Sequence, residues 1–201
     1  MRTLVALLSI AACVCAQGPS KSGCFPIPSN MQEYWRGADL SEADQTLVSN
    51  AIEADLMDLE KDCEDKYKSK ADSVDLAGAS LGKLGKGVFV RMSGSCMCGA
   101  TGNCPIYVYV REKDLFRHVL ADDDQRPMGW TFAVVNSKTA IPDIVLASNG
   151  GGGTANLSLF RYVGSKYVLR AFETLEEKGG GASGGSFDPA AVVVKSCHIV
   201  K

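Results

Sequence analysis

Cysteine is the most distinctive reactive residue of this chain, which has eight cysteines but only two histidines. Six of them follow residue 16: Cys24, Cys63, Cys96, Cys98, Cys104 and Cys197. An even number of cysteines in an exported chain predicts disulfides, here three bonds that could be connected in fifteen ways. The segment between Cys98 and Cys104 holds two glycines and an asparagine, which tolerate tight turns and favour a bond between these two cysteines. We then expect Cys24–Cys63 and Cys96–Cys197 as the other two bonds.

Metal binding is the alternative chemistry for these sulfurs. Zinc ligands could be drawn from Cys96, Cys98, Cys104, Cys197 and His198, but the chain has no C-x-x-C pair. Asp122, Asp123 and Asp124 could offer oxygen ligands to calcium, yet they lack the alternating spacing and turn glycine of a calcium loop. The sequence therefore predicts neither a metal nor another cofactor.

No catalytic residue emerges from the motifs. Ser183 stands in a G-x-S-x-G match, but its neighbours are flexible glycines rather than the strand and helix that a nucleophile elbow requires. Asp143 follows Pro142 at the start of a predicted strand, a position typical of turn capping. Since no acid–base pair stands out among the 23 acidic residues, the chain is more consistent with binding than with catalysis.

Two positions are candidates for contact or modification. Thr101, Gly102 and Asn103 lie in the short cysteine-bracketed loop and are the residues we expect to contact a ligand. Asn156 begins an Asn-Leu-Ser sequon, which would carry a glycan if the host is eukaryotic.

One amphipathic helix is expected to position part of this chemistry. Ser41 to Asp44 approximates a capping box, with aspartate in place of the usual glutamate. Apolar residues then recur at helical spacing: Leu47, Val48, Ala51, Ile52, Leu56, Leu59 and Cys63. Residues 17–38, rich in proline and glycine, are predicted to be irregular.

Short β-rich runs follow the helix. We expect strands at 87–93, 105–111, 115–120, 130–136, 143–148, 156–163, 166–172 and 191–197, with residues 178–186 as an exposed glycine-rich loop. Because no helices separate these runs, they predict a mainly antiparallel sheet. The expected fold is a single disulfide-stapled α+β domain over residues 39–201, in which the amphipathic helix packs on the sheet.

The first sixteen residues predict export. Arg2, the apolar run 4–14 and the small residues before Gln17 follow the order of a secretory signal peptide. Residues 10–13 also fit a lipoprotein box, which would attach a lipid to Cys13. No apolar stretch is long enough for a transmembrane segment, and a net charge of −2 argues against nucleic-acid binding.

The segment Cys98-Gly-Ala-Thr-Gly-Asn-Cys104-Pro105 and the aromatic-rich hairpin near Gly164 and Tyr167 carry a resemblance. Over roughly residues 87–172 the chain resembles a group of secreted bacterial β-rich proteins with no assigned activity. The resemblance implies an exported β-rich domain and no particular reaction.

These observations lead to two hypotheses for function. The first is a secreted or periplasmic binding module that recognises a protein or glycan, in one version as an inhibitor of a secreted hydrolase. The second is a secreted hydrolase whose carboxylates are brought together by the fold. A deep pocket containing Asp143, Asp122 or His118 would favour the hydrolase.

Overall fold

The computed structural model describes residues 23–29, 31, 40–62, 74–94, 97–120, 127–136, 139–177 and 192–200. One α-helix and ten strands follow one another in this order: α1 (Glu42–Asp62), β1 (Val74–Ser80), the 3₁₀ turn η3 (Gly82–Leu84), β2 (Lys86–Met92), β3 (Cys104–Glu112), β4 (Leu115–His118), β5 (Met128–Gly129), β6 (Thr131–Val135), β7 (Asp143–Gly151), β8 (Thr154–Val163), β9 (Lys166–Glu177) and β10 (Val192–Ile199). Several sequence predictions lie outside these residues: the signal peptide, Cys13, Cys63, Cys96, Asp122 to Asp124, Ser183 and the loop 178–186.

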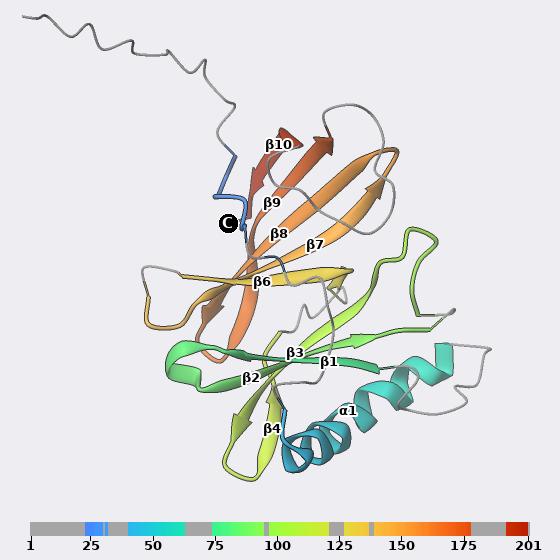
Figure 1. The fold of residues 1–201 in the computed structure, drawn as a ribbon, viewed down its shortest axis with the longest axis vertical. Helices are drawn as coiled ribbons and strands as arrows, with labels where there is room; N and C mark the ends of the chain where they lie inside the picture. Colours follow the sequence, from blue (N-terminus) through green and yellow to red (C-terminus); the bar gives the residue numbers. More distant parts are fainter. Residues whose placement is uncertain are drawn as a thin grey trace, which may run out of the picture.

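The α+β prediction is wrong, because the described chain consists mainly of two antiparallel sheets. The first sheet has the order β1-β2-β3-β4, with β5 paired to the beginning of β3, and the second has the order β10-β9-β8-β7-β6. Figure 1 shows them as two separate layers, with α1 on the first sheet alone. The error has a physical reason. Strands that follow one another in sequence are expected to pair with one another, but their order does not show where one sheet ends and another begins.

Strands β5 and β6 link the two sheets. Strand β5 pairs with Cys104 and Pro105 of β3, and after Trp130 the chain continues as β6, which pairs with β7. Gly129 is required at this crossing, since an added Cβ would lie 2.7 Å from the Ala147 carbonyl oxygen and 3.0 Å from Ile106 Cδ1. The backbones of the two sheets therefore approach each other more closely here than a side chain allows.

The sheets also meet at the other side, where β4 ends against the start of β9. Leu120 forms a parallel bridge to Tyr167, and the Tyr167 amide donates to the Val119 carbonyl at 2.6 Å. The buried Tyr167 hydroxyl donates to the Pro142 carbonyl at 3.0 Å. The two sheets are thus joined by two backbone connections: the pairing of β5 with β3 and the bridge between Leu120 and Tyr167.

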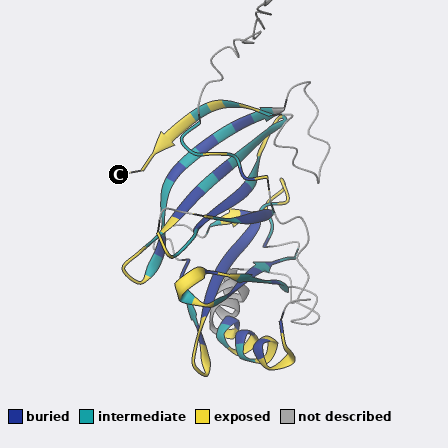
Figure 2. Ribbon diagram, turned by 60° about the vertical axis from the view of Figure 1, so that its left-hand side comes forward, coloured by how far each residue is buried: buried dark blue, intermediate teal, exposed yellow. Residues whose placement is uncertain are grey.

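The central core lies where the sheets face each other. It contains residues of both sheets: Ala77, Leu81, Phe89, Ile106, Val108, Val110, Val119, Leu120, Phe132, Ile144, Leu146, Phe160 and Tyr167. Phe89 and Phe132 stack across the interface with ring centroids 3.7 Å apart. In Figure 2 buried residues accordingly recur along the strands of both sheets.

The helix begins as the sequence predicts. Ser41 Oγ accepts a hydrogen bond from the Asp44 amide at 3.1 Å, and Val48 and Ile52 are buried against the outer face of the first sheet. Asp44 does not complete the capping box: its buried carboxylate instead accepts hydrogen bonds from Lys86, at 2.8 Å, and from Arg111. Within the described residues, no helix is long and apolar enough to cross a membrane.

The outer face of the second sheet is covered by the N-terminal segment, residues 23–29. Cys24, Phe25 and Ile27 pack on an apolar cluster of β7, β8 and β9. A disulfide joins Cys24 to Cys197 in β10, with the two Cα atoms 5.6 Å apart. This bond, called here the terminal disulfide, shows that the expected pairings Cys24–Cys63 and Cys96–Cys197 are wrong. Chain position alone could not reveal that the segment lies beside β10.

Candidate functional site

The loop between Cys98 and Cys104 is closed as the sequence predicts. The two cysteines form a disulfide, called here the loop disulfide, with their Cα atoms 4.1 Å apart. The Gly99 amide donates to the Asn103 carbonyl at 2.8 Å, and the Gly102 amide donates to the Gly99 carbonyl at 2.8 Å. Gly102 has a φ of +76°, which favours glycine at this turn. The loop is therefore a compact turn with its ends joined covalently.

Asn103 and Asn149 connect this loop to the end of β7, and we call this pair the amide clasp. Asn103 Nδ2 donates to the Asn149 carbonyl at 2.8 Å, and the Asn149 amide donates to Asn103 Oδ1 at 2.7 Å. Asn149 Nδ2 also donates to the Thr101 carbonyl at 2.7 Å. These three bonds cross between segments 46 to 48 residues apart and fix the loop on the second sheet.

The clasp leaves a small, uncharged tip in solvent. Thr101 and Gly102 are exposed, whereas Asn103 is half-buried because its side chain faces Asn149. The neighbouring β7–β8 turn is also exposed at Gly151 and Gly152, and its residue Thr154 donates from its hydroxyl to the Gly151 carbonyl at 2.6 Å. Of the three predicted contact residues, two thus form the accessible tip and Asn103 positions them.

Asn156 lies in β8, close to this turn. Its Oδ1 accepts a hydrogen bond from the Thr174 hydroxyl at 3.1 Å, and it is half-buried between its partners in β7 and β9. The sequon is therefore part of a strand ladder rather than of an open loop.

A second concave site lies on the outer face of the second sheet, and we call it the outer pocket. It has a volume of about 610 Å³ and contains Asp143, the residue named above as a criterion for a hydrolase. Asp143 is held by Arg161, whose Nη2 donates to Oδ2 at 2.8 Å and whose Nε lies 3.2 Å from Oδ1. The same hydrogen bonds raise the pKa of Arg161, so the guanidinium stays charged.

The groups needed for hydrolysis do not converge in the outer pocket. His118 belongs to β4 of the first sheet, where its ring packs 5.2 Å from Tyr107 and 5.1 Å from Tyr109, measured between ring centroids. Asp122 lies outside the described residues. Among the described residues that line the pocket, Asp143 is the one carboxylate and no histidine is present. The carboxylate is thus committed to an ion pair rather than placed for proton transfer.

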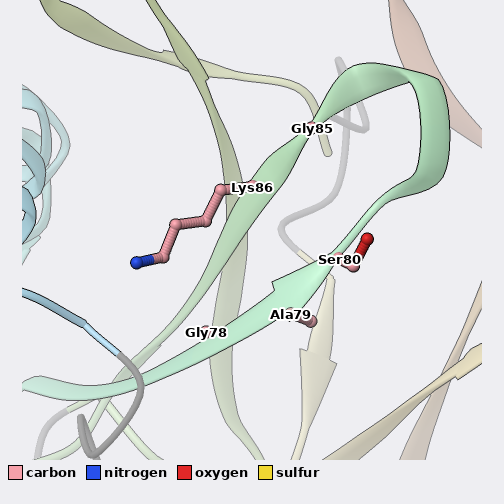
Figure 3. Close-up of a pocket in the computed structure, with 5 residues that line it drawn as sticks. All are labelled: Gly78, Ala79, Ser80, Gly85 and Lys86. Carbon is pink, nitrogen blue, oxygen red and sulfur yellow. The ribbon is translucent and has the colours of Figure 1, made fainter.

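Lys86 and Ser80 line a shallower hollow of about 340 Å³ beside the η3 turn, together with Gly78, Ala79 and Gly85. Figure 3 shows the Lys86 side chain extending away from Ser80, and its ammonium binds Asp44 at 2.8 Å. This hydrogen bond holds the pKa of Asp44 below its usual range. Lys86, the one charged residue among the described lining residues, is thus paired with Asp44 rather than directed into the hollow.

Glu173 in β9 is fully buried beside the terminal disulfide. Its Oε1 accepts a hydrogen bond from the Phe25 amide at 2.9 Å, while Oε2 has no partner among the described residues. Burial raises the pKa of this carboxyl above its usual value. Cys24, Glu173 and Cys197 bring three potential metal-ligand atoms within 4.8 Å of one another, but both sulfurs are already joined to each other. The loop disulfide likewise occupies two of the sulfurs considered for zinc.

Three important residues were not identified from the sequence: Asn149, Arg161 and Glu173. Asn149 stands before a glycine tract, which signals a turn but not its partner. Arg161 is the one charge between Leu157 and Val163, a signal that could have been used, whereas Glu173 lies between Arg170 and Glu176 and carries no such signal.

Comparison with known proteins gave no match: no family model, no curated protein and no solved structure is significantly similar to this chain.

Proposed function

We propose that this protein is an extracytoplasmic binding module that recognises a protein partner through the tip of the loop closed by Cys98 and Cys104. The two disulfides within the described residues are consistent with an oxidising compartment outside the cytosol. Within that setting we propose a secreted or periplasmic protein released from its signal peptide, with lipid attachment at Cys13 as the alternative route.

The observation that carries the proposal is the fixed shape of the tip. The loop disulfide closes its ends and the amide clasp holds its side, whereas Thr101 and Gly102 remain in solvent. A loop ordered before binding loses less conformational entropy on association than a flexible one. The exposed residues of the tip are also small and uncharged, so they add no bulk or charge that a cleft would have to accommodate.

An enzyme cleft is the partner surface that fits such a tip best. Secreted hydrolases have concave substrate sites, and a rigid loop can occupy one of them without providing catalytic groups. We therefore propose inhibition of a secreted hydrolase as the specific activity. The hydrolase alternative is less well supported, because Arg161 holds the one carboxylate of the outer pocket among the described residues.

The test is inhibition of purified lysozyme, chymotrypsin and subtilisin by the oxidised protein. Thr101→Arg should abolish inhibition by enlarging the tip, and Asn149→Ala should weaken it about tenfold by releasing the clasp. Asp114→Arg, at the exposed β3–β4 turn, is the matched control and should inhibit like the wild type.

Failure to inhibit any of the three enzymes at micromolar concentration would remove the inhibitor proposal. Equal inhibition by wild type and Thr101→Arg would show that another surface makes the contact.

A further inference from the structure

The outer pocket has the size and the walls of a small-molecule site. Its volume of about 610 Å³ lies within the range of about 300–1,000 Å³ found for ligand pockets. One wall is the N-terminal segment, through Phe25, Pro26 and Pro28, and the other is the second sheet, through Val135 and Leu159. These side chains offer a mostly apolar surface to a ligand.

One cation lies in this apolar lining. The Arg161 side chain is 49% exposed, whereas the Asp143 side chain that it binds is only 6% exposed. The accessible charge of the pair is therefore positive, although the pair as a whole is neutral. A ligand with an anionic group would gain from this arrangement.

Arg161 has donors available for such a group. A guanidinium has five N–H bonds, and Asp143 engages the donors on Nε and Nη2. Within the described part of the chain, no acceptor is bound to Nη1. Nη1 and the second hydrogen of Nη2 can thus donate a pair of hydrogen bonds to a ligand carboxylate, in the paired geometry that arginine favours.

The pocket does not need to be assembled by the ligand. The terminal disulfide fixes Cys24 to β10, and Glu173 Oε1 binds the amide of Phe25, the next residue. An added Cβ at Gly23 would contact this carboxylate, so the segment lies close to the sheet. These attachments preorganise the wall that the N-terminal segment provides.

We propose that the outer pocket binds an amphipathic carboxylate, with its hydrocarbon part against Phe25, Pro26 and Leu159 and its carboxylate on Arg161. A medium-chain fatty acid has this chemistry. The site is separate from the loop tip, and its occupancy requires no protein partner.

Isothermal titration of the oxidised protein with decanoate and with decanol tests the proposal. Decanoate should bind one to one, and at least about tenfold more tightly than decanol, because only the carboxylate forms charge-assisted hydrogen bonds. Added salt should weaken decanoate binding and leave decanol binding nearly unchanged. This salt arm uses the wild-type protein and is independent of any variant's stability.

The double variant Asp143→Asn/Arg161→Gln removes both charges without leaving a buried carboxylate unpaired. It should bind decanol as the wild type does and lose the preference for decanoate. Arg170→Gln removes a charge in β9 from a residue that does not line the pocket and should keep that preference. No decanoate binding up to millimolar concentration, or a preference that survives in the double variant, would overturn the proposal.

Discussion

Replacing Glu173 by glutamine should stabilise the folded protein at mildly alkaline pH and leave its stability nearly unchanged in acid. The carboxyl is fully buried and its Oε2 has no hydrogen-bond partner among the described residues. Burial raises its pKa in the folded state, so the folded protein retains a proton that the unfolded chain has already released. The protonated Glu173 carboxyl therefore contributes stability that is present below its pKa in the unfolded chain and is lost as the pH rises through its pKa in the folded protein.

The magnitude follows from the contacts of the two carboxylate oxygens. Glutamine can keep its Oε1 as the acceptor for the Phe25 amide, and it replaces an unpartnered charged oxygen by a neutral amide group. A buried group without a partner costs about 1–3 kcal/mol, and more when it is charged. Because the new amide is also unpartnered, we expect a net gain of about 1–2 kcal/mol near pH 8 and less than about 0.5 kcal/mol near pH 4.

Urea denaturation of the oxidised wild type and of Glu173→Gln across this pH range measures the difference. Glu176→Gln is the control in the same strand, since Glu176 is 42% exposed and pairs with Lys195 at the surface. Its stability should follow that of the wild type within about 0.5 kcal/mol. A Glu173→Gln protein that is less stable than the wild type near pH 8 would refute the argument, because burial of a charge would then not dominate.

Three further predictions concern the fold. By the chain-entropy relation, serine substitution of the terminal disulfide, which spans 173 residues, should cost about 5 kcal/mol, against about 2.2 kcal/mol for the loop disulfide, which spans 6. Guanidinium denaturation measures both losses, and a larger loss for the loop disulfide would contradict the relation. Gly129→Ala should lower the free energy of unfolding by about 1–3 kcal/mol, because its Cβ would lie 2.7 Å from the Ala147 carbonyl oxygen. The control Gly99→Ala, whose Cβ would have its nearest neighbours at 3.9 Å, should lower it by less than about 1 kcal/mol. Equal losses of the two variants in thermal denaturation would oppose this explanation. Asp44, whose pKa is lowered chiefly by the hydrogen bond from Lys86, contributes stability above its unfolded pKa that is lost as the pH falls through its folded pKa. In urea denaturation at a series of acidic pH values, Asp44→Asn should therefore lose less unfolding free energy with falling pH than the wild type. An equal loss in both proteins would argue against this role of Asp44.

Local features of the fold could be predicted from the sequence. Ser41 is the expected cap of the helix, and the short glycine-containing loop between Cys98 and Cys104 closes as anticipated. Most strands also lie within a few residues of their predicted positions. Strand β1 was missed because Ala77, Gly78 and Ala79 have low β-propensity and resemble a linker.

Contacts between distant segments could not be predicted in the same way. The chain passes from one sheet to the other at Gly129, through a close backbone approach that hydrophobic periodicity does not signal. The amide clasp joins residues 46 positions apart, and the terminal disulfide joins residues 173 apart. In both pairs, the sequence around one residue gives no indication of the other. The contacts that hold the tip and the N-terminal wall of the outer pocket are therefore visible only in the tertiary structure.

The bond between Cys24 and Cys197 turns the intervening polypeptide into a covalent ring. A single proteolytic cut at any peptide bond inside that ring opens it without releasing a fragment. Such a nick would leave the mass of the non-reduced protein increased by one water, and separate pieces would appear only after reduction. Protection of this kind is consistent with the proposed inhibition of a secreted hydrolase.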